Sequence, residues 1–227
     1  MNTNTYQLTL LITERCNLHC AYCYCNGGSR TVMTFEVAKQ AIDEVVALGH
    51  KHVKLLLMGG EPFLNFKLLR EVVEYAEKHC EVVQIKTVSN GTLIHGEIQD
   101  WLIQHRESLF VSLSLDGDRE SHNRNRCNSY DQIDFPFFIQ TYGKNAEANM
   151  VVVPDNLDNL SHNVQYVEQM GFRVKCVLAD DEGWIAERDC PRLAEQLDKL
   201  IQHYTTHPEV TPFTMLREAL DKVEKPS

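Results

Sequence analysis

Three cysteines crowd into one short segment near the N-terminus, and their spacing is the most chemically specific feature of the sequence. Cys16, Cys20 and Cys23 form the pattern Cys-x3-Cys-x2-Cys, so one loop can bring three thiolates to one metal centre. Thiolates are the usual protein ligands of iron–sulfur clusters, and a 4Fe–4S cluster held by three of them keeps one iron open. Zinc is the main competitor, because cysteine loops also bind it and His19 and Cys25 lie nearby. No second ligand pair of comparable spacing is present, so the cluster is favoured.

The other cysteines do not repeat this spacing. Disulfide frameworks are typical of short secreted chains, whereas this sequence has 227 residues and no basic segment followed by an apolar one at its start. We therefore expect a reducing, cytoplasmic setting. The scattered cysteines are predicted to be small buried hydrophobic residues or free thiols: Cys25, Cys80, Cys127, Cys176 and Cys190.

A second motif, Gly59-Gly60-Glu61-Pro62, follows a continuous apolar segment. Adjacent glycines let a backbone approach a ligand closely and adopt positive φ angles. The Glu61 carboxylate is suited to an ammonium group, and Pro62 is suited to the first turn of a following helix. An ordinary strand-to-helix turn is the alternative interpretation, because glycine-rich turns are common.

Polar residues also follow two later apolar segments. Ser89-Asn90-Gly91 follows one of them, and the end of the next carries Ser114-Leu115-Asp116-Gly117. In parallel α/β barrels the functional residues gather at the carboxyl ends of the strands. We therefore expect these segments, the cysteine loop and the glycine turn to lie on one face of the fold.

The elements that must position these residues alternate between strand and helix. Apolar runs separated by amphipathic segments predict a parallel sheet. A complete eight-unit barrel takes about 250 residues, so the predicted fold is a partial (β/α)6 barrel of the α/β class. The predicted strands are 6–13, 52–58, 81–88, 109–115, 148–153 and 172–179, and the predicted helices are 34–48, 65–79, 96–106, 129–142, 159–170 and 191–203.

The six units define a predicted catalytic core over residues 1–205. Residues 206–227 fall outside these units and are predicted to form a C-terminal helix or linker. This tail either leads into an auxiliary domain or ends a compact enzyme.

Together the motifs resemble those of the radical SAM superfamily, whose members act on S-adenosylmethionine (SAM). The cysteine pattern, with Tyr22 before its last cysteine, is similar to the family signature, and the glycine turn resembles the second family motif. The segment from Ser114 to Gly117, followed by His122-Asn123-Arg124-Asn125-Arg126, resembles a pattern of anaerobic sulfatase maturases and related peptide-modifying enzymes. Asn123 replaces the usual Asp of that pattern. The auxiliary-cluster cysteines of the C-terminal SPASM or twitch domains in these relatives are missing from this sequence.

The resemblance implies a reaction and its cofactors. A 4Fe–4S cluster would reductively cleave SAM to methionine and a 5′-deoxyadenosyl radical, which would take hydrogen from a peptide or protein substrate. The electron would come from a reductant such as flavodoxin or ferredoxin. The implied ligands of the cluster are Cys16, Cys20 and Cys23. A glycyl-radical-enzyme activase and a non-catalytic iron–sulfur or zinc module remain alternatives.

The resemblance also implies roles at the matching positions. The SAM amino group would meet the glycine turn, and the Arg126 guanidinium would pair with the SAM carboxylate. The residues predicted to bind SAM are Tyr22, Gly59, Gly60, Glu61, Ser89, Asn90, Ser114, Arg126 and Leu178. No residue is assigned to catalysis.

Simpler roles remain open for several of these residues. Ser114 is also suited to ending a strand, Arg126 to an exposed charge and Leu178 to the core. Asp116 is also suited to a turn before Gly117.

The overall charge and hydropathy narrow the set of partners. A formal net charge of −10 argues against broad surfaces for nucleic acids or anionic membranes. The sequence also lacks a stretch that approaches 18 uninterrupted apolar residues, so a membrane span is not expected.

Overall fold

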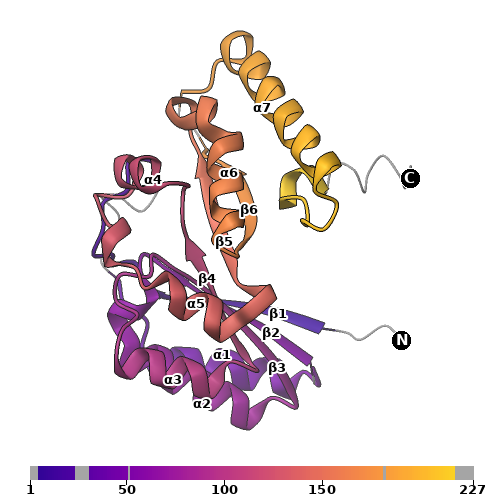
Figure 1. Cartoon of the computed structure of the whole chain (residues 1–227). Coiled ribbons are helices and arrows are strands. Elements are labelled where there is room, and N and C mark those ends of the chain that lie inside the picture. Colours follow the sequence, from indigo (N-terminus) through magenta and orange to yellow (C-terminus); the bar gives the residue numbers. More distant parts are fainter. Residues whose placement is uncertain (1–4, 24–30, 51, 181–182, 218–227) are drawn as a thin grey trace. The chain divides into compact units, whose positions relative to one another are not determined.

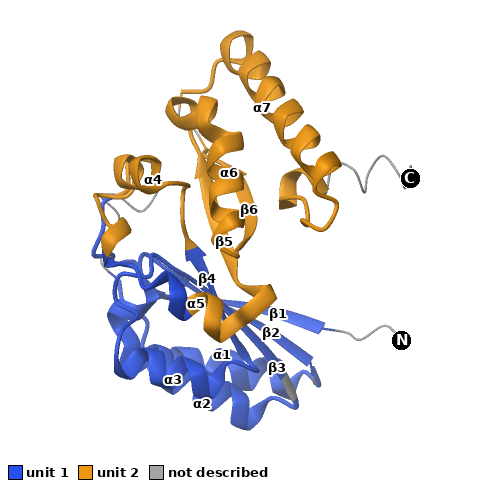
Figure 2. Cartoon of the chain, viewed as in Figure 1, with its two compact units in different colours: residues 1–19, 23–113, 132–137 blue, residues 20–22, 114–131, 138–227 orange. Residues whose placement is uncertain are grey.

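The computed structural model describes residues 5–23, 31–50, 52–180 and 183–217 (Figure 1). The chain divides into two compact units, which Figure 2 shows in different colours. Unit 1 comprises residues 1–19, 23–113 and 132–137, and unit 2 comprises residues 20–22, 114–131 and 138–227. The cysteine loop therefore contributes Cys16 and Cys23 to unit 1 and Cys20 to unit 2.

The six strands form one parallel sheet in the order β1-β2-β3-β4-β5-β6, and the sheet is not closed. This confirms the predicted α/β class and the partial barrel. Each predicted strand is present with bounds that differ by no more than one residue, because continuous apolar runs mark buried parallel strands. The strands are β1 (Thr5–Thr13), β2 (His52–Gly59), β3 (Val82–Ser89), β4 (Leu109–Ser114), β5 (Glu147–Val152) and β6 (Arg173–Leu178).

Unit 1 packs its helices along strands β1 to β3. Leu55 and Leu57 of β2 are fully buried, as are Leu69 and Val72 on the facing helix α2. The Thr34 hydroxyl accepts a hydrogen bond from the backbone N–H of Val37 and so caps the first helix. The helices of this unit are α1 (Phe35–Ala47), η1 (Pro62–Asn65), α2 (Phe66–His79) and α3 (Glu97–His105).

The predicted helix over residues 129–142 is wrong in its first half. The chain forms a short 3-10 turn, η2 (Tyr130–Gln132), and then helix α5 (Phe135–Tyr142). Pro136 disfavours helical geometry in the residue before it, and it is tolerated only near a helix start. The Asp134 side chain accepts a hydrogen bond from the Phe137 N–H, which fixes the new start.

Unit 2 contains one helix that was not predicted, α4 (Arg119–Asn125), which directly follows the Ser114–Gly117 motif. The Asp118 carboxylate caps it by accepting a 2.8 Å hydrogen bond from the N–H of Ser121. The other elements of this unit include η3 (Gly143–Asn145), η4 (Pro154–Asn159), α6 (Leu160–Gln169) and α7 (Ala186–Thr206).

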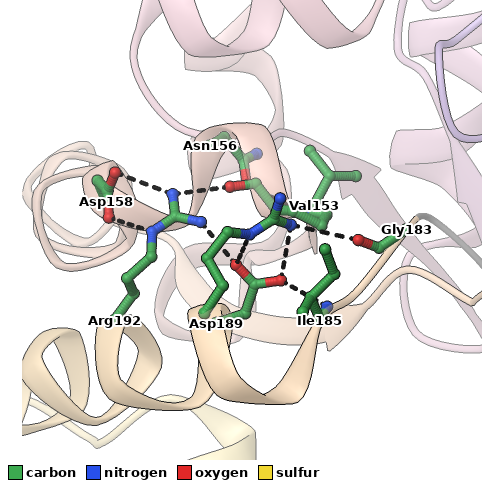
Figure 3. Close-up of polar contacts among 9 residues, drawn as sticks. Val153, Asn156, Asp158, Gly183, Ile185, Asp189 and Arg192 are labelled. Carbon is green, nitrogen blue, oxygen red and sulfur yellow. Dashed lines mark hydrogen bonds and ion pairs between the residues drawn. The ribbon is translucent and has the colours of Figure 1, made fainter.

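Helix α7 begins five residues before the predicted start at Pro191. The reason is the Asp189 carboxylate, which accepts hydrogen bonds from the Ile185 N–H and from the Arg188 and Arg192 guanidinium groups (Figure 3). Arg192 also reaches the Asp158 carboxylate on η4. These bonds hold the first turns of α7 although a proline lies inside the helix.

The C-terminal tail follows helix α7 and is described as far as residue 217. Within the predicted tail, Thr206 ends helix α7, residues 207–213 are not helical and residues 214–217 are helical, while residues 218–227 lie outside the described residues. Within the described part of the chain, no helix combines the length and the apolar character that crossing a membrane requires.

Candidate active site

The glycine turn after β2 lies against the backbone that follows β1. The N–H of Gly60 donates to the Thr13 carbonyl at 2.8 Å, and the N–H of Glu61 donates to the Arg15 carbonyl at 2.8 Å. A Cβ atom on Gly59 would lie 2.5 Å from the Thr13 oxygen, and one on Gly60 would lie 2.5 Å from the Arg15 oxygen. Close approach within the chain therefore requires both glycines, whereas the expected positive φ angles do not occur at either position.

Glu61 joins the turn after β2 to the turn after β3. Its side chain is almost fully buried, with 1% of its surface exposed. One carboxylate oxygen accepts hydrogen bonds from the Phe63 N–H and the Ser89 hydroxyl, and the other accepts a 2.7 Å bond from the Asn90 N–H. The predicted contact with a ligand ammonium would therefore use a carboxylate that already has three partners in the chain.

Asn90 extends this network to the first cysteine. Its side-chain N–H2 group donates to the Asn17 amide oxygen at 2.9 Å and lies 3.9 Å from the Cys16 sulfur. The same sulfur accepts a hydrogen bond from the Leu18 N–H at 3.4 Å. Thr92 completes the set, since it donates to the Asn90 oxygen and accepts from the Asn17 amide.

Asn17 and Thr92 were not singled out from the sequence. The available signal was their position, directly after the first cysteine and two residues after Asn90, where asparagine side chains commonly bond the backbone two residues ahead. The Thr92 N–H donates to the Asn90 side-chain oxygen at 3.0 Å, as such a turn requires.

The residues present fit an iron–sulfur cluster by their chemistry. Cys16, Cys20 and Cys23 form no disulfides, and the N–H groups directed at the Cys16 sulfur match the hydrogen bonds that tune cluster thiolates. Burial raises the pKa of the Cys16 thiol, although the hydrogen bond from Leu18 opposes the shift. A bound iron would offset this effect, because metal coordination deprotonates a thiol.

In the described ranges, which include Cys16, Cys20 and Cys23, side chains of His, Cys, Asp or Glu do not gather in groups of three that could hold a metal ion, so a cluster bound by all three cysteines stays a prediction. Among the other cysteines, Cys80 and Cys176 are buried as predicted, whereas Cys127 and Cys190 are exposed. Cys25, which belongs to the zinc alternative, lies outside the described residues.

The second cluster of polar residues lies in unit 2 and centres on Asp116, which is fully buried. Its carboxylate accepts hydrogen bonds from the Tyr22 hydroxyl at 2.5 Å, the Asn125 amide at 3.3 Å and the Val151 N–H at 3.0 Å. The Arg126 guanidinium donates two more, at 2.9 and 3.1 Å. Asp116 is therefore the centre of a buried network, a role that goes beyond the turn before Gly117.

Arg126 is 7% exposed, so the alternative of an exposed charge is also wrong. Its guanidinium carbon lies 5.3 Å from the centre of the Tyr22 ring. Burial alone would lower the pKa of Arg126, but the adjacent Asp116 carboxylate outweighs it and raises the pKa. Within the chain this guanidinium meets the Asp116 carboxylate, and its implied contact with the SAM carboxylate stays a prediction.

His122 of α4 is fully buried beside this network. One ring nitrogen lies 3.0 Å from the Ser129 hydroxyl, and the other accepts from the Asp116 N–H at 3.5 Å. Burial, followed by the charge of Arg126, lowers the pKa of His122 to about 4. The imidazole is therefore neutral near pH 7 and supports the Asp116 turn.

The remaining predicted SAM ligands fall in both units. Ser114 at the end of β4 is 8% exposed and belongs to unit 2. Leu178 at the end of β6 is 38% exposed, so its interpretation as a core residue is wrong. The structure thus joins Cys16, Glu61, Ser89 and Asn90 in unit 1, and Tyr22 with Arg126 in unit 2.

Comparison with known proteins identifies the family. The sequence profile of the Radical SAM superfamily matches residues 10–167, which is more than half of the chain. The chain belongs to the radical SAM superfamily. Members of this family use a 4Fe–4S cluster and SAM.

Three curated relatives have names that differ in the function they describe. An uncharacterized protein of Methanocaldococcus jannaschii is 30% identical over 76% of this chain and 61% of its own length. A cysteine-type anaerobic sulfatase-maturating enzyme of Clostridium perfringens is 31% identical over 52% of this chain and 35% of its own. An S-adenosylmethionine-dependent nucleotide dehydratase of Psychrobacter lutiphocae is 27% identical over 50% of this chain and 41% of its own. The chain thus spans between 35% and 61% of these relatives.

Solved structures share the fold. Native anSMEcpe with bound AdoMet and Kp18Cys peptide has a TM-score of 0.84 over 96% of this chain and 66% of that chain, at 18% identity. At this identity the likeness concerns the fold.

Proposed function

We propose that the chain binds a 4Fe–4S cluster through Cys16, Cys20 and Cys23 and cleaves SAM to modify a peptide or protein side chain. The observation that carries the proposal is the continuous set of contacts from Glu61 through Asn90 to the Cys16 sulfur. These contacts join the cysteine loop and the glycine turn, the two motifs on which the resemblance to the family mainly rests. A bound cluster supplies the electron that breaks the S–C5′ bond of SAM and yields methionine and the 5′-deoxyadenosyl radical.

In this proposal the chain's own residues bind SAM and orient it. The backbone of Gly59 and Gly60 and the Glu61 carboxylate would receive the SAM amino group, because ammonium groups bind carboxylates and carbonyls. Ser89 and Asn90 would hold the Glu61 carboxylate in place, as their 2.9 and 2.7 Å hydrogen bonds indicate. Tyr22, Ser114 and Leu178 remain predicted SAM contacts.

Cluster binding is tested by anaerobic reconstitution of the full chain. We expect the wild type to hold iron and sulfide and, with dithionite and SAM, to form 5′-deoxyadenosine. Cys20→Ala should lose the cluster, whereas Cys190→Ala, which removes an exposed thiol of helix α7, should keep it. The absence of 5′-deoxyadenosine, together with an EPR signal that SAM does not perturb, would leave a non-catalytic metal module as the better interpretation.

The peptide assignment rests on the Ser114–Gly117 and His122–Arg126 motifs and on the sulfatase-maturating relative. The nucleotide dehydratase among the relatives makes nucleotides the competing substrate class. We expect a cysteine-containing peptide of the type that sulfatase maturases modify to accelerate 5′-deoxyadenosine formation, with a mass change in the peptide. Acceleration by nucleoside triphosphates and not by the peptide would reject the peptide assignment and retain the radical SAM reaction.

A further inference from the structure

The middle of the cysteine loop is bound to the segment after β4, entirely within unit 2. The N–H of Ala21 donates to the Asn125 carbonyl at 2.9 Å, and the Tyr22 hydroxyl donates to Asp116 at 2.5 Å. Tyr22 also lies against the Arg126 guanidinium. Both residues of the loop that directly follow Cys20 are therefore held by this one segment.

The same segment buries one negative and one positive charge. Asp116 is fully buried and Arg126 is 7% exposed, so both lose most of their hydration. Such pairs often stabilise a fold less than apolar residues of similar size, so a gain in stability is a weak explanation for this one. The ion pair of Asp116 and Arg126 instead contacts Tyr22 of the cysteine loop. Because the two charges are opposite, the pair adds no net charge beside the loop.

Cys20 lies within the electrostatic influence of this pair. Its side chain is 8% exposed, and it directly precedes Ala21 and Tyr22, the two residues that bind Asn125, Asp116 and Arg126. In low-dielectric surroundings an uncompensated charge acts strongly on its neighbours. Loss of either member of the pair would therefore change the charge next to this cysteine.

We propose that Tyr22, Asp116, Asn125 and Arg126 form a charge-neutral clamp that positions Cys20 as a cluster ligand and sets the electrostatic potential beside it. The proposal rests on the proposed function, and its four members are positioning residues. It assigns Arg126 to the cysteine loop through Asp116, and not to the SAM carboxylate.

The positioning part is tested without any cluster, by hydrogen exchange of the apoprotein. Tyr22→Phe removes only the hydroxyl that reaches Asp116 and keeps the aromatic ring. We expect the Ala21 amide to exchange about tenfold faster or more, as for the loss of one charge-assisted hydrogen bond. The control is Asp131→Asn, because Asp131 forms an equally close but exposed pair with Arg119. Unchanged Ala21 exchange in Tyr22→Phe would overturn the clamp.

The charge part is tested by the reduction potential of the reconstituted cluster. Asp116→Asn leaves an extra positive charge and should raise the midpoint potential, whereas Arg126→Gln leaves a negative charge and should lower it. If the pair had a role in folding alone, the midpoint potentials of both variants would shift in the same direction or would not change. Either result would overturn the charge proposal. If these variants fail to fold, the Tyr22→Phe exchange experiment still decides the positioning part.

Two further outcomes separate the alternatives. Failure of the wild type to hold a cluster would contradict the proposed function, while the exchange experiment would still report on the clamp. If Arg126→Gln abolished the effect of SAM on the EPR signal but left the potential and Ala21 exchange unchanged, Arg126 would be a SAM ligand and the clamp would be wrong.

Discussion

Gly60 shows how closely the active-site backbone is packed at the scale of one residue. A Cβ atom there would lie 2.5 Å from the carbonyl oxygen of Arg15 and 2.8 Å from that of Glu14, and neither backbone group can rotate away. We expect Gly60→Ala to lower the free energy of unfolding by about 1–3 kcal/mol, the usual range for overpacking. Urea unfolding of the full chain measures this loss of stability.

The control for this substitution is Gly49→Ala, at a position with open space but a φ of +84°. It isolates the backbone cost of a left-handed residue, about 1 kcal/mol. A smaller loss for Gly60→Ala than for Gly49→Ala would contradict the close-packing argument.

Glu168 on α6 is a second residue whose surroundings make a prediction. Its side chain is 8% exposed, one oxygen accepts from the Tyr204 hydroxyl and the other lies 3.5 Å from His203. Burial raises the pKa of Glu168 to about 6, although the hydrogen bond from Tyr204 opposes the shift. Between pH 4.5 and 6 the folded protein therefore binds more protons than the unfolded chain, and its stability falls as the pH rises.

Glu168→Gln should remove this effect, because the amide is neutral at every pH and still accepts from Tyr204. We expect the variant to be more stable than the wild type by about 2 kcal/mol above pH 6.5, and by almost nothing at pH 4. Urea unfolding of the wild type and of Glu168→Gln, above pH 6.5 and at pH 4, checks the sign of this stability difference. Glu195→Gln, an exposed residue of α7 paired with Lys199, should show no such dependence.

At the scale of elements, Asp189 decides where helix α7 begins. It is 3% exposed and accepts hydrogen bonds from Ile185, Arg188 and Arg192. Figure 3 shows that Arg192 also binds Asp158. The Asp158 side chain is largely exposed. We expect Asp189→Asn to lower the melting temperature more than Asp158→Asn, because exposed ion pairs contribute little. Equal losses would show that the first turns of α7 do not depend on this carboxylate.

The elements also show where sequence reasoning succeeds. The strand bounds agree within one residue, because long apolar runs have few alternative structures. Prolines were less informative: Pro191 predicted a helix start but lies inside α7, since the side chains of Asp189 and Arg192 offset the lost backbone bond. Helix α4 was missed because it has only seven residues and is polar, and because its cap, Asp118, lies between the two motifs that the sequence analysis singled out.

At the scale of the whole molecule, the proposed cluster should link folding to metal loading. A ligand that binds only the folded chain raises its stability by mass action. We expect the reconstituted protein to melt several degrees above the apoprotein under anaerobic conditions, since 1 kcal/mol corresponds to about 2–4 °C at this size. Cys16→Ala should abolish the difference, and an unchanged difference would exclude Cys16 as a ligand.

The sequence by itself determined the family motifs, the α/β class and the order of strands and helices, because spacing and apolar periodicity are local properties of the chain. Only the tertiary structure decided which partners the motif residues have. It directed Glu61 to Ser89 and Asn90, and Arg126 to Asp116. A buried charge takes the nearest partner that the fold provides, and nothing in a linear sequence states which residues become neighbours on folding. Two of the three cysteines that the sequence identified thus gained distant surroundings on folding: Asn90 lies beside Cys16, and Asp116 and Asn125 bind the two residues that follow Cys20.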